Sequence, residues 1–208
     1  MDFKKVVVAT GLFTTILITS STQAIGAQQK RVANVPPTED GGMVYTASDL
    51  ASLTPAARPG DVISPEALLA ALHDSVSGPP GPVDWNRFRS LFLPAARLGS
   101  SRTDAQGVTH VTTSSVEELI TSGAAEREKM PWYEVILVKH IEKFDNIAVA
   151  YYSHDDRPAR EGNAIQRSVN ICEMLYDGKR WWIHSASWDV VPTSMSLPPD
   201  LDPLKQTK

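Results

Sequence analysis

The stretch Arg167–Trp188, RSVNICEMLYDGKRWWIHSASW, carries the pattern that decides the fold. It consists of two runs rich in β-branched and aromatic residues, separated by Asp177 and Gly178. An Asp-Gly pair tolerates the positive φ angles that a two-residue hairpin loop requires. The stretch therefore predicts a β-hairpin near the end of the chain.

The predicted register assigns each side chain of the hairpin to one of two faces. Without a bulge, Glu173 pairs with Trp182 and Ile171 pairs with His184, and paired side chains share a face. One face then carries Val169, Ile171, Glu173, Leu175, Trp182, His184, Ala186 and Trp188. The other carries Ser168, Asn170, Cys172, Met174, Tyr176, Trp181, Ile183, Ser185 and Ser187. Because neither face is purely polar, we expect both to be covered, and a one-residue slip would exchange the two sets.

The composition is that of an ordinary globular protein. The chain has 208 residues, of which 42% are hydrophobic and 21% are charged, so it has room for one domain and some additional chain. The formal net charge of −4 argues against a protein that binds nucleic acid regardless of sequence, because such a protein needs a basic face. The single cysteine, Cys172, cannot form an internal disulfide, and its apolar surroundings favour a buried packing role.

Residues 1–27 have the order of a secretory signal peptide. Lys4 and Lys5 precede an apolar run over residues 6–18, and cleavage is expected after Ala24 or Ala27. The run is shorter than the roughly 20 residues of a membrane-spanning helix, so no stable membrane span is expected after cleavage. An uncleaved anchor is the alternative. Given a bacterial source, we expect a periplasmic or secreted protein.

The rest of the chain divides into three segments. Residues 28–62 contain scattered prolines and glycines without hydrophobic periodicity, which predicts a mostly irregular linker with a short helix near residues 47–53. Residues 63–191 contain the periodic helix and strand patterns and form the predicted domain. Residues 192–208 are a proline-containing C-terminal tail.

Within the domain, helix signals precede strand signals. Helices are predicted to start after the capping residues Ser64 and Asp84, and a third after Ser114 or Ser115. Short strands are expected at 97–102 and 108–112, and long strands at 132–144 and 147–154 before the hairpin. This order predicts an α+β fold in which helices pack on one face of a strongly curved antiparallel sheet.

Several local motifs resemble the nuclear transport factor 2-like superfamily, also called SnoaL-like, and are most similar to its small bacterial exported members of unassigned function. The resemblance covers about residues 63–191 and rests on DWNRFRSLF at 84–92, ARL at 96–98, HIEKFDNIA at 140–148, Asn170, DGKRWWI at 177–183 and Trp188. It implies a cone-shaped fold, a curved antiparallel β-sheet with three N-terminal helices packed on its concave face, and a pocket between the two. The family includes isomerases, dehydratases and epoxide hydrolases as well as members that only bind or dimerise. We find no match to the catalytic residue sets of those enzymes.

Glu173 and His184 are the candidate catalytic pair. In the predicted register they are diagonal neighbours on one face, where a carboxylate in an apolar cavity would have a raised pKa and a nearby imidazole could relay a proton. In the alternative interpretation, Glu173 pairs with a basic group such as Arg180, and His184 caps a local hydrogen-bond network. The candidate ligand-binding residues are Trp182, Ile171, Tyr133 and Tyr152.

Neither a metal nor a cofactor is expected. His154, Asp155 and Asp156 are adjacent in sequence at the end of a predicted strand, which favours a solvated loop over a set of metal ligands. His73 is expected at the surface of the first helix.

Three functions remain open at this stage. The first is a domain that binds a small apolar ligand in the cone pocket and forms a homodimer through the outer face of the sheet. The second is a cofactor-free lyase, isomerase or hydrolase that uses Glu173 and His184 as acid and base. The third is a structural or protein-interaction domain that uses residues 28–61.

Overall fold

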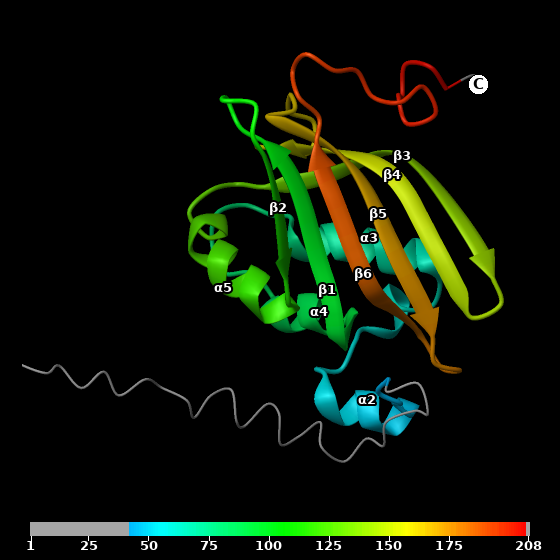
Figure 1. Cartoon of the computed structure of the whole chain (residues 1–208). Coiled ribbons are helices and arrows are strands. Elements are labelled where there is room, and N and C mark those ends of the chain that lie inside the picture. Colours follow the sequence, from blue (N-terminus) through cyan, green and yellow to red (C-terminus); the bar gives the residue numbers. More distant parts are fainter. Residues whose placement is uncertain (1–41, 207–208) are drawn as a thin grey trace, which may run out of the picture. The chain divides into compact units, whose positions relative to one another are not determined.

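The computed structural model describes residues 42–206 (Figure 1). The predicted signal peptide and the first part of the predicted linker, residues 28–41, lie outside the described residues. Residues 44–206 belong to one compact unit, which is described by itself below. Within residues 42–206, no helix has the length and apolar character that a membrane crossing requires.

The helices begin at the capping residues that the sequence indicates. The unit contains α2 (Ala47–Leu53), the 3-10 helix η1 (Pro59–Asp61), α3 (Pro65–Val76), α4 (Trp85–Arg89) and α5 (Val116–Arg127). The Ser64 hydroxyl accepts a hydrogen bond from the backbone N–H of Ala67 at 3.1 Å, which satisfies one of the free donors at the start of α3. Ser115 and Glu118 form a capping box at the start of α5.

Six strands form one sheet in the order β2-β1-β6-β5-β4-β3. Their bounds are β1 (Phe92–Thr103), β2 (Thr109–Ser114), β3 (Tyr133–Phe144), β4 (Ile147–Arg157), β5 (Gln166–Tyr176) and β6 (Trp181–Val190). Neighbouring strands are antiparallel except β1 and β6, which are parallel. β1 is longer than predicted, and its pairing with β6 is interrupted between Phe92 and Arg97, around Pro94, which has no N–H to donate.

The hairpin of β5 and β6 forms where predicted, but its predicted register is wrong. Tyr176 pairs with Trp181, so the loop has four residues and not two. The Asp177 Oδ1 atom accepts hydrogen bonds from the backbone N–H groups of Lys179 and Arg180, both at 2.8 Å. These bonds stabilise a wider turn in which Gly178, with φ of 89°, supplies the positive φ angle.

A β-bulge further along the hairpin changes which face each side chain occupies. The pairing shifts between Met174–Ile183 and Glu173–Ser185, so His184 is the extra residue on β6. Beyond the bulge, Ala186 takes the face opposite to that of His184. The face set predicted without a bulge is therefore wrong for the second half of β6.

The core lies between the concave face of the curved sheet and the helices, with α3 crossing behind the strands in Figure 1. It includes Leu68 and Leu69 of α3, Phe88 of α4, and Met174 and Ile183 of the last hairpin. The observed architecture confirms the predicted α+β class and the curved sheet with helices on its concave face.

The C-terminal segment after β6 packs on the outer face of the sheet. The Ser153 hydroxyl of β4 donates a hydrogen bond to the Leu201 carbonyl at 2.8 Å. The Nε2 atom of His140 on β3 lies 2.9 Å from the Asp200 carbonyl oxygen. The Leu201 side chain is completely buried. The predicted tail therefore contains residues that contribute to packing.

Candidate functional site

A cavity of about 390 Å³ lies between the concave face of the sheet and helices α3, α4 and α5. Its apolar lining consists of Leu72, Val76, Trp85, Phe88, Leu98, Leu119, Met130, Trp132, Ala186 and Trp188. Its polar lining includes His73, Glu134, Tyr152, His154, Asp156, Gln166, Ser168 and Asn170. The cavity is therefore mainly apolar, and the strands β3 to β5 contribute most of its polar groups.

His73 joins three elements around one buried hydrogen-bond network. It projects from α3, and its Nδ1 atom lies 2.7 Å from Oε2 of Glu134 on β3. Its Nε2 atom lies 3.0 Å from the hydroxyl of Tyr152 on β4. The indole Nε1 of Trp132 donates a 3.3 Å hydrogen bond to the other Glu134 oxygen. Glu134 is thus held between an imidazole and an indole.

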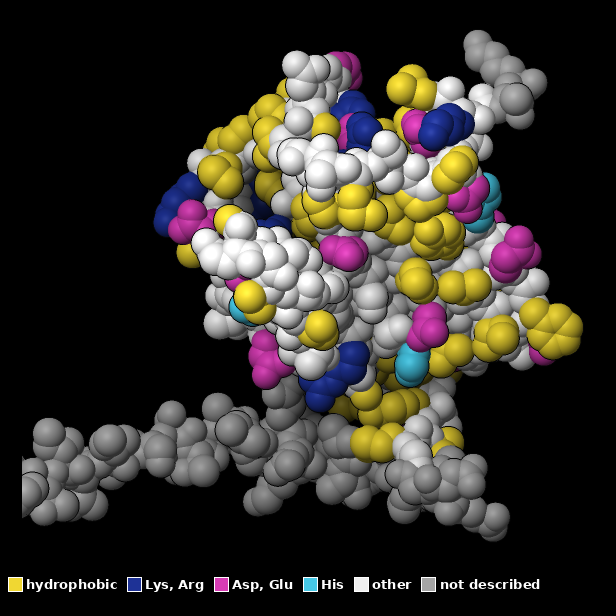
Figure 2. All heavy atoms as spheres, turned by 45° about the horizontal axis from the view of Figure 1, so that its top comes forward, with side chains coloured by type: hydrophobic (Ala, Val, Ile, Leu, Met, Phe, Trp, Pro, Cys, Tyr) yellow, Lys and Arg dark blue, Asp and Glu magenta, His cyan; other side chains and the backbone are white. Residues whose placement is uncertain are grey.

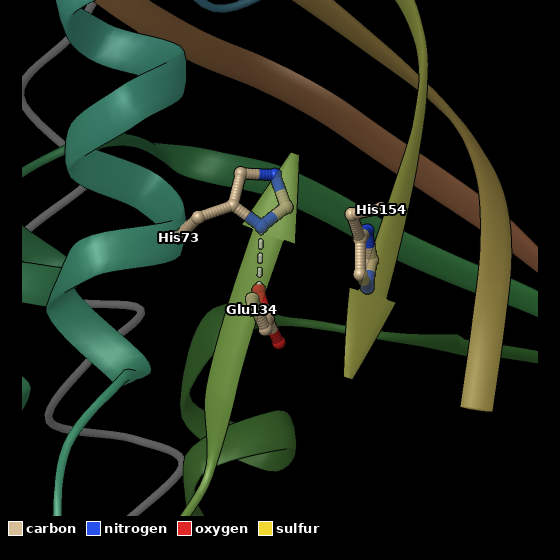
Figure 3. A group of neighbouring side chains, drawn as sticks. All are labelled: His73, Glu134 and His154. Carbon is tan, nitrogen blue, oxygen red and sulfur yellow. Dashed lines mark hydrogen bonds and ion pairs between the residues drawn. The ribbon is translucent and has the colours of Figure 1, made fainter. Parts of the chain in front are cut away.

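A second histidine faces the first from the neighbouring strand. The ring centroids of His73 and His154 are 4.9 Å apart, and the two rings flank Glu134 (Figure 3). The His154 Nε2 atom lies 3.1 Å from Oδ1 of Asp156, and its Nδ1 atom lies 3.0 Å from the Asn170 amide nitrogen. Each histidine is therefore held on both ring nitrogens.

Burial and hydrogen bonds shift the pKa values of Glu134 and His154 in opposite directions. Burial opposes ionisation of Glu134, but the hydrogen bond and charge of His73 outweigh it and hold the Glu134 pKa below its ordinary value. Burial likewise opposes protonation of His154, but the hydrogen bond to Asp156 and the nearby carboxylates raise the His154 pKa. Burial raises the pKa of Tyr152 well above its ordinary value, so its hydroxyl stays a neutral donor.

Two buried polar atoms of the cavity lining have no hydrogen-bond partner among the described residues. They are the indole Nε1 of Trp85 and the hydroxyl oxygen of Ser168. A buried polar group without a partner costs about 1–3 kcal/mol. A molecule bound in the cavity could satisfy both atoms.

The predicted catalytic pair does not lie in this cavity. Glu173 and His184 do approach each other, with His184 Nδ1 and Glu173 Oε2 3.5 Å apart, but on the outer face, where their side chains are 56% and 54% exposed. A hydrogen bond from the Ser185 hydroxyl holds the pKa of Glu173 below its ordinary value, opposite to the rise expected in an apolar cavity. The helices cover the other face of the hairpin, so the expected cavity position of both residues is wrong.

Among the predicted ligand-binding residues, only Tyr152 lines the cavity. Ile171 is on the outer face and exposed. Trp182 is buried, but its ring stacks under the Arg180 guanidinium, whose Cζ is 3.3 Å from the ring centroid. Tyr133 is half-buried, and the Arg160 guanidinium lies over its ring.

The sequence interpretation missed the two histidines that do line the cavity. His73 was expected at the surface and His154 in a solvated loop, but both are buried. One signal was available for His154, because alternation along β4 places Ala150, Tyr152, His154 and Asp156 on one face. No local signal indicated that His73 would meet Glu134, which is 61 residues away along the chain.

The geometry supports two chemical uses of this cluster. The Tyr152 hydroxyl and the two imidazoles can orient a polar group of a molecule in the cavity by hydrogen bonds. The cluster of His73, Glu134 and His154 can also supply ligands to a metal ion. Each residue offers one ligand atom, and the three atoms lie within 4.8 Å of one another.

Helices precede a curved sheet in the chain, and the concave face of the sheet borders the cavity. The sequence resemblance to nuclear transport factor 2-like proteins implied this arrangement, a curved sheet with helices on its concave face. Neither a protein-family model nor a curated protein matches the sequence.

Solved structures with a similar architecture include nuclear transport factor 2-like proteins of unknown function. One from Shewanella baltica has 14% identity and a TM-score of 0.42, over 61% of this chain and 90% of that one. One from Silicibacter pomeroyi has 16% identity and a TM-score of 0.42, over 61% and 92%. A protein of unknown function with a cystatin-like fold from Nostoc punctiforme has 12% identity and a TM-score of 0.47, over 63% and 96%.

Proposed function

We propose that this nuclear transport factor 2-like domain binds a small, largely apolar molecule that carries one polar group. The cavity between the sheet and the helices is the observation that supports the proposal. Its volume of about 390 Å³ is within the range of small-molecule sites, and its lining combines apolar walls with a few convergent polar atoms.

The lining also suggests how the molecule would be oriented. Burial of its apolar part against Leu72, Leu119 and Trp188 supplies the main favourable term, about 25 cal/mol per Å² of apolar surface. Its polar group is directed toward the Tyr152 hydroxyl and the unpartnered Ser168 hydroxyl. An apolar group placed against the Ser168 hydroxyl would leave it without a partner, so the polar group determines the orientation.

The proposal is tested by ligand capture and by a variant that fills the cavity. Small molecules that co-purify with the protein are identified by mass spectrometry, and binding of an apolar fluorescent probe is measured through quenching of the tryptophans. Gly123 faces the cavity from α5, and a Cβ atom added there meets no atom within 4 Å. Gly123→Leu should weaken probe binding by about tenfold or more, which is about 1.4 kcal/mol.

Ala125→Leu is the matched control, because Ala125 is an exposed residue of the same helix. It should leave probe binding unchanged. If the wild-type protein neither carries a small molecule nor binds the probe, or if both variants bind the probe equally well, the proposal is wrong.

We also propose that two copies of the chain associate through the outer face of the sheet. Four apolar side chains of β4 and β5, Ile147, Val149, Ile171 and Leu175, are exposed there. Figure 2 views this side of the molecule, where hydrophobic side chains lie among acidic and histidine side chains over the strands. Contiguous exposed apolar side chains are typical of interaction surfaces.

A further inference from the structure

We propose that His73, Glu134 and His154 form a binding site for a divalent transition-metal ion such as Zn²⁺. The proposal goes beyond small-molecule binding and stands on a different observation, the geometry of three side chains from α3, β3 and β4 (Figure 3). Two imidazoles and one carboxylate are the protein ligands of many catalytic zinc sites and of non-haem iron sites.

The outer contacts of the two histidines are those expected of metal ligands. A ligating histidine usually has its other ring nitrogen held by a hydrogen-bonding group, which fixes the tautomer and the ring orientation. In a metal-bound state the outer ring nitrogens carry the protons. The Tyr152 hydroxyl oxygen, 3.0 Å from Nε2 of His73, accepts one, and the Asn170 amide, whose nitrogen lies 3.0 Å from Nδ1 of His154, turns so that its oxygen accepts the other. This assigns Nδ1 of His73 and Nε2 of His154 to the metal.

The two assigned nitrogens are the atoms that contact carboxylates in the metal-free protein. His73 Nδ1 lies 2.7 Å from Glu134, and His154 Nε2 lies 3.1 Å from Asp156. A divalent cation would take the place of the protons in these contacts, and each neutral imidazole would then carry its proton on the outer ring nitrogen. Asp156, fixed at 2.9 Å by the Gln166 amide, then remains as a carboxylate beside the ion.

The charge balance of the pocket favours a cation. Within residues 42–206, Glu134 and Asp156 form ion pairs with His73 and His154 but with no lysine or arginine; Arg127, also in the cavity lining, acts on Glu134 without an ion-pair contact. A buried carboxylate is costly unless it is paired or coordinates a metal. A divalent ion between the two histidines would compensate both carboxylates, and the adjoining cavity leaves room for a non-protein ligand.

The test uses the full chain without a polyhistidine tag. The protein is stripped with a chelator, reloaded with Co²⁺ and desalted, and bound cobalt is measured by elemental analysis and by its visible absorption. About one cobalt ion per chain with tetrahedral-type bands is expected. Glu134→Gln and His154→Gln should each weaken binding by about 100-fold or more. Asn170→Ala should weaken binding by about 10-fold or more through loss of the outer contact.

His184→Gln is the matched control, because His184 also lies beside a glutamate but has no third ligand nearby among the described residues. It should bind cobalt as the wild type does. The proposal is overturned if the wild type retains no stoichiometric cobalt, or if Glu134→Gln and His154→Gln retain as much as the wild type. The apolar probe, measured on the same variants, reports separately on the cavity and on folding.

Discussion

The carboxylate of Asp177 accepts a hydrogen bond from the indole Nε1 of Trp182 at 2.8 Å. The same side chain accepts two backbone hydrogen bonds from its own turn. One residue therefore holds both the loop and the Trp182 indole at the start of β6. Because the pairing of β5 with β6 starts at this loop, Asp177 stabilises the residues from which the pairing begins, Tyr176 and Trp181.

Replacing Asp177 with asparagine should destabilise the domain in a pH-dependent way. Burial opposes ionisation of Asp177, but the hydrogen bonds from Trp182 and the turn outweigh it and hold the Asp177 pKa below its ordinary value. The ionised Asp177 carboxylate therefore makes its full contribution to the free energy of unfolding above the unfolded-state pKa of about 3.9. This contribution is lost as pH falls through the lower folded-state pKa. Urea denaturation should give a loss of about 1–2 kcal/mol at pH 7 and a smaller loss at pH 3.

Asp189→Asn is the control for this measurement, because Asp189 is an exposed acid on β6. It should change stability by less than about 0.5 kcal/mol at either pH. An Asp177→Asn effect that is equally large at pH 3 and pH 7 would contradict the assignment of the effect to the ionised carboxylate.

The C-terminal segment is expected to contribute to stability through one leucine. Leu201 is 0% exposed and Leu204 is 92% exposed, so the two residues form a matched pair. Leu201→Ala should lower the free energy of unfolding by about 3 kcal/mol, as for other buried leucines, and Leu204→Ala should have almost no effect. Equal denaturation midpoints for the two variants would show that the segment does not pack on the sheet in solution.

The proposed homodimer predicts that a charge on the outer face separates the two copies. Ile171→Lys would place an ammonium group in the apolar surface, and a buried unpaired charge is strongly unfavourable. Light scattering should give a dimer for the wild type and a monomer for this variant. Ile63→Lys, at an exposed isoleucine just before α3, should remain dimeric. A monomeric wild type at all accessible concentrations would rule out the dimer.

Cys172 should be unreactive in the folded protein. It is completely buried on β5, and burial raises the pKa of its thiol to about 12. Since the thiolate is the reactive form, labelling by a disulfide reagent at pH 8 should be slow in the native state and should become stoichiometric in guanidinium chloride. Rapid labelling without denaturant would indicate that this part of the sheet opens readily.

The signal peptide prediction concerns residues outside the structure and needs a direct measurement. Expression of the full chain in a bacterial host and intact-mass analysis of the periplasmic fraction should give a chain that begins at Ile25 or Gln28. A cell fraction that retains only the uncleaved chain would favour the membrane-anchor alternative.

Local interactions explain the parts of the fold that were predicted correctly. Ser64 and Ser115 cap helices in the structure because the cap requires only a side-chain oxygen and a backbone N–H a few residues away. The alternation of residues in β3 to β6 likewise indicates strands from neighbouring residues alone. The turn at residues 177–180 was placed correctly but given the wrong length, because the side-chain hydrogen bonds of Asp177 compete with the two-residue loop.

The sequence by itself determined the helices, the long strands and the position of the last hairpin, because these depend on neighbouring residues. Only the tertiary structure decided which side chains of β6 line the cavity, because the bulge at His184 changes the parity of the strand pairing beyond it. It also decided the candidate site. His73 and Glu134 meet only when α3 packs on the concave face of the sheet, and no short-range pattern encodes a contact between residues so far apart in the chain.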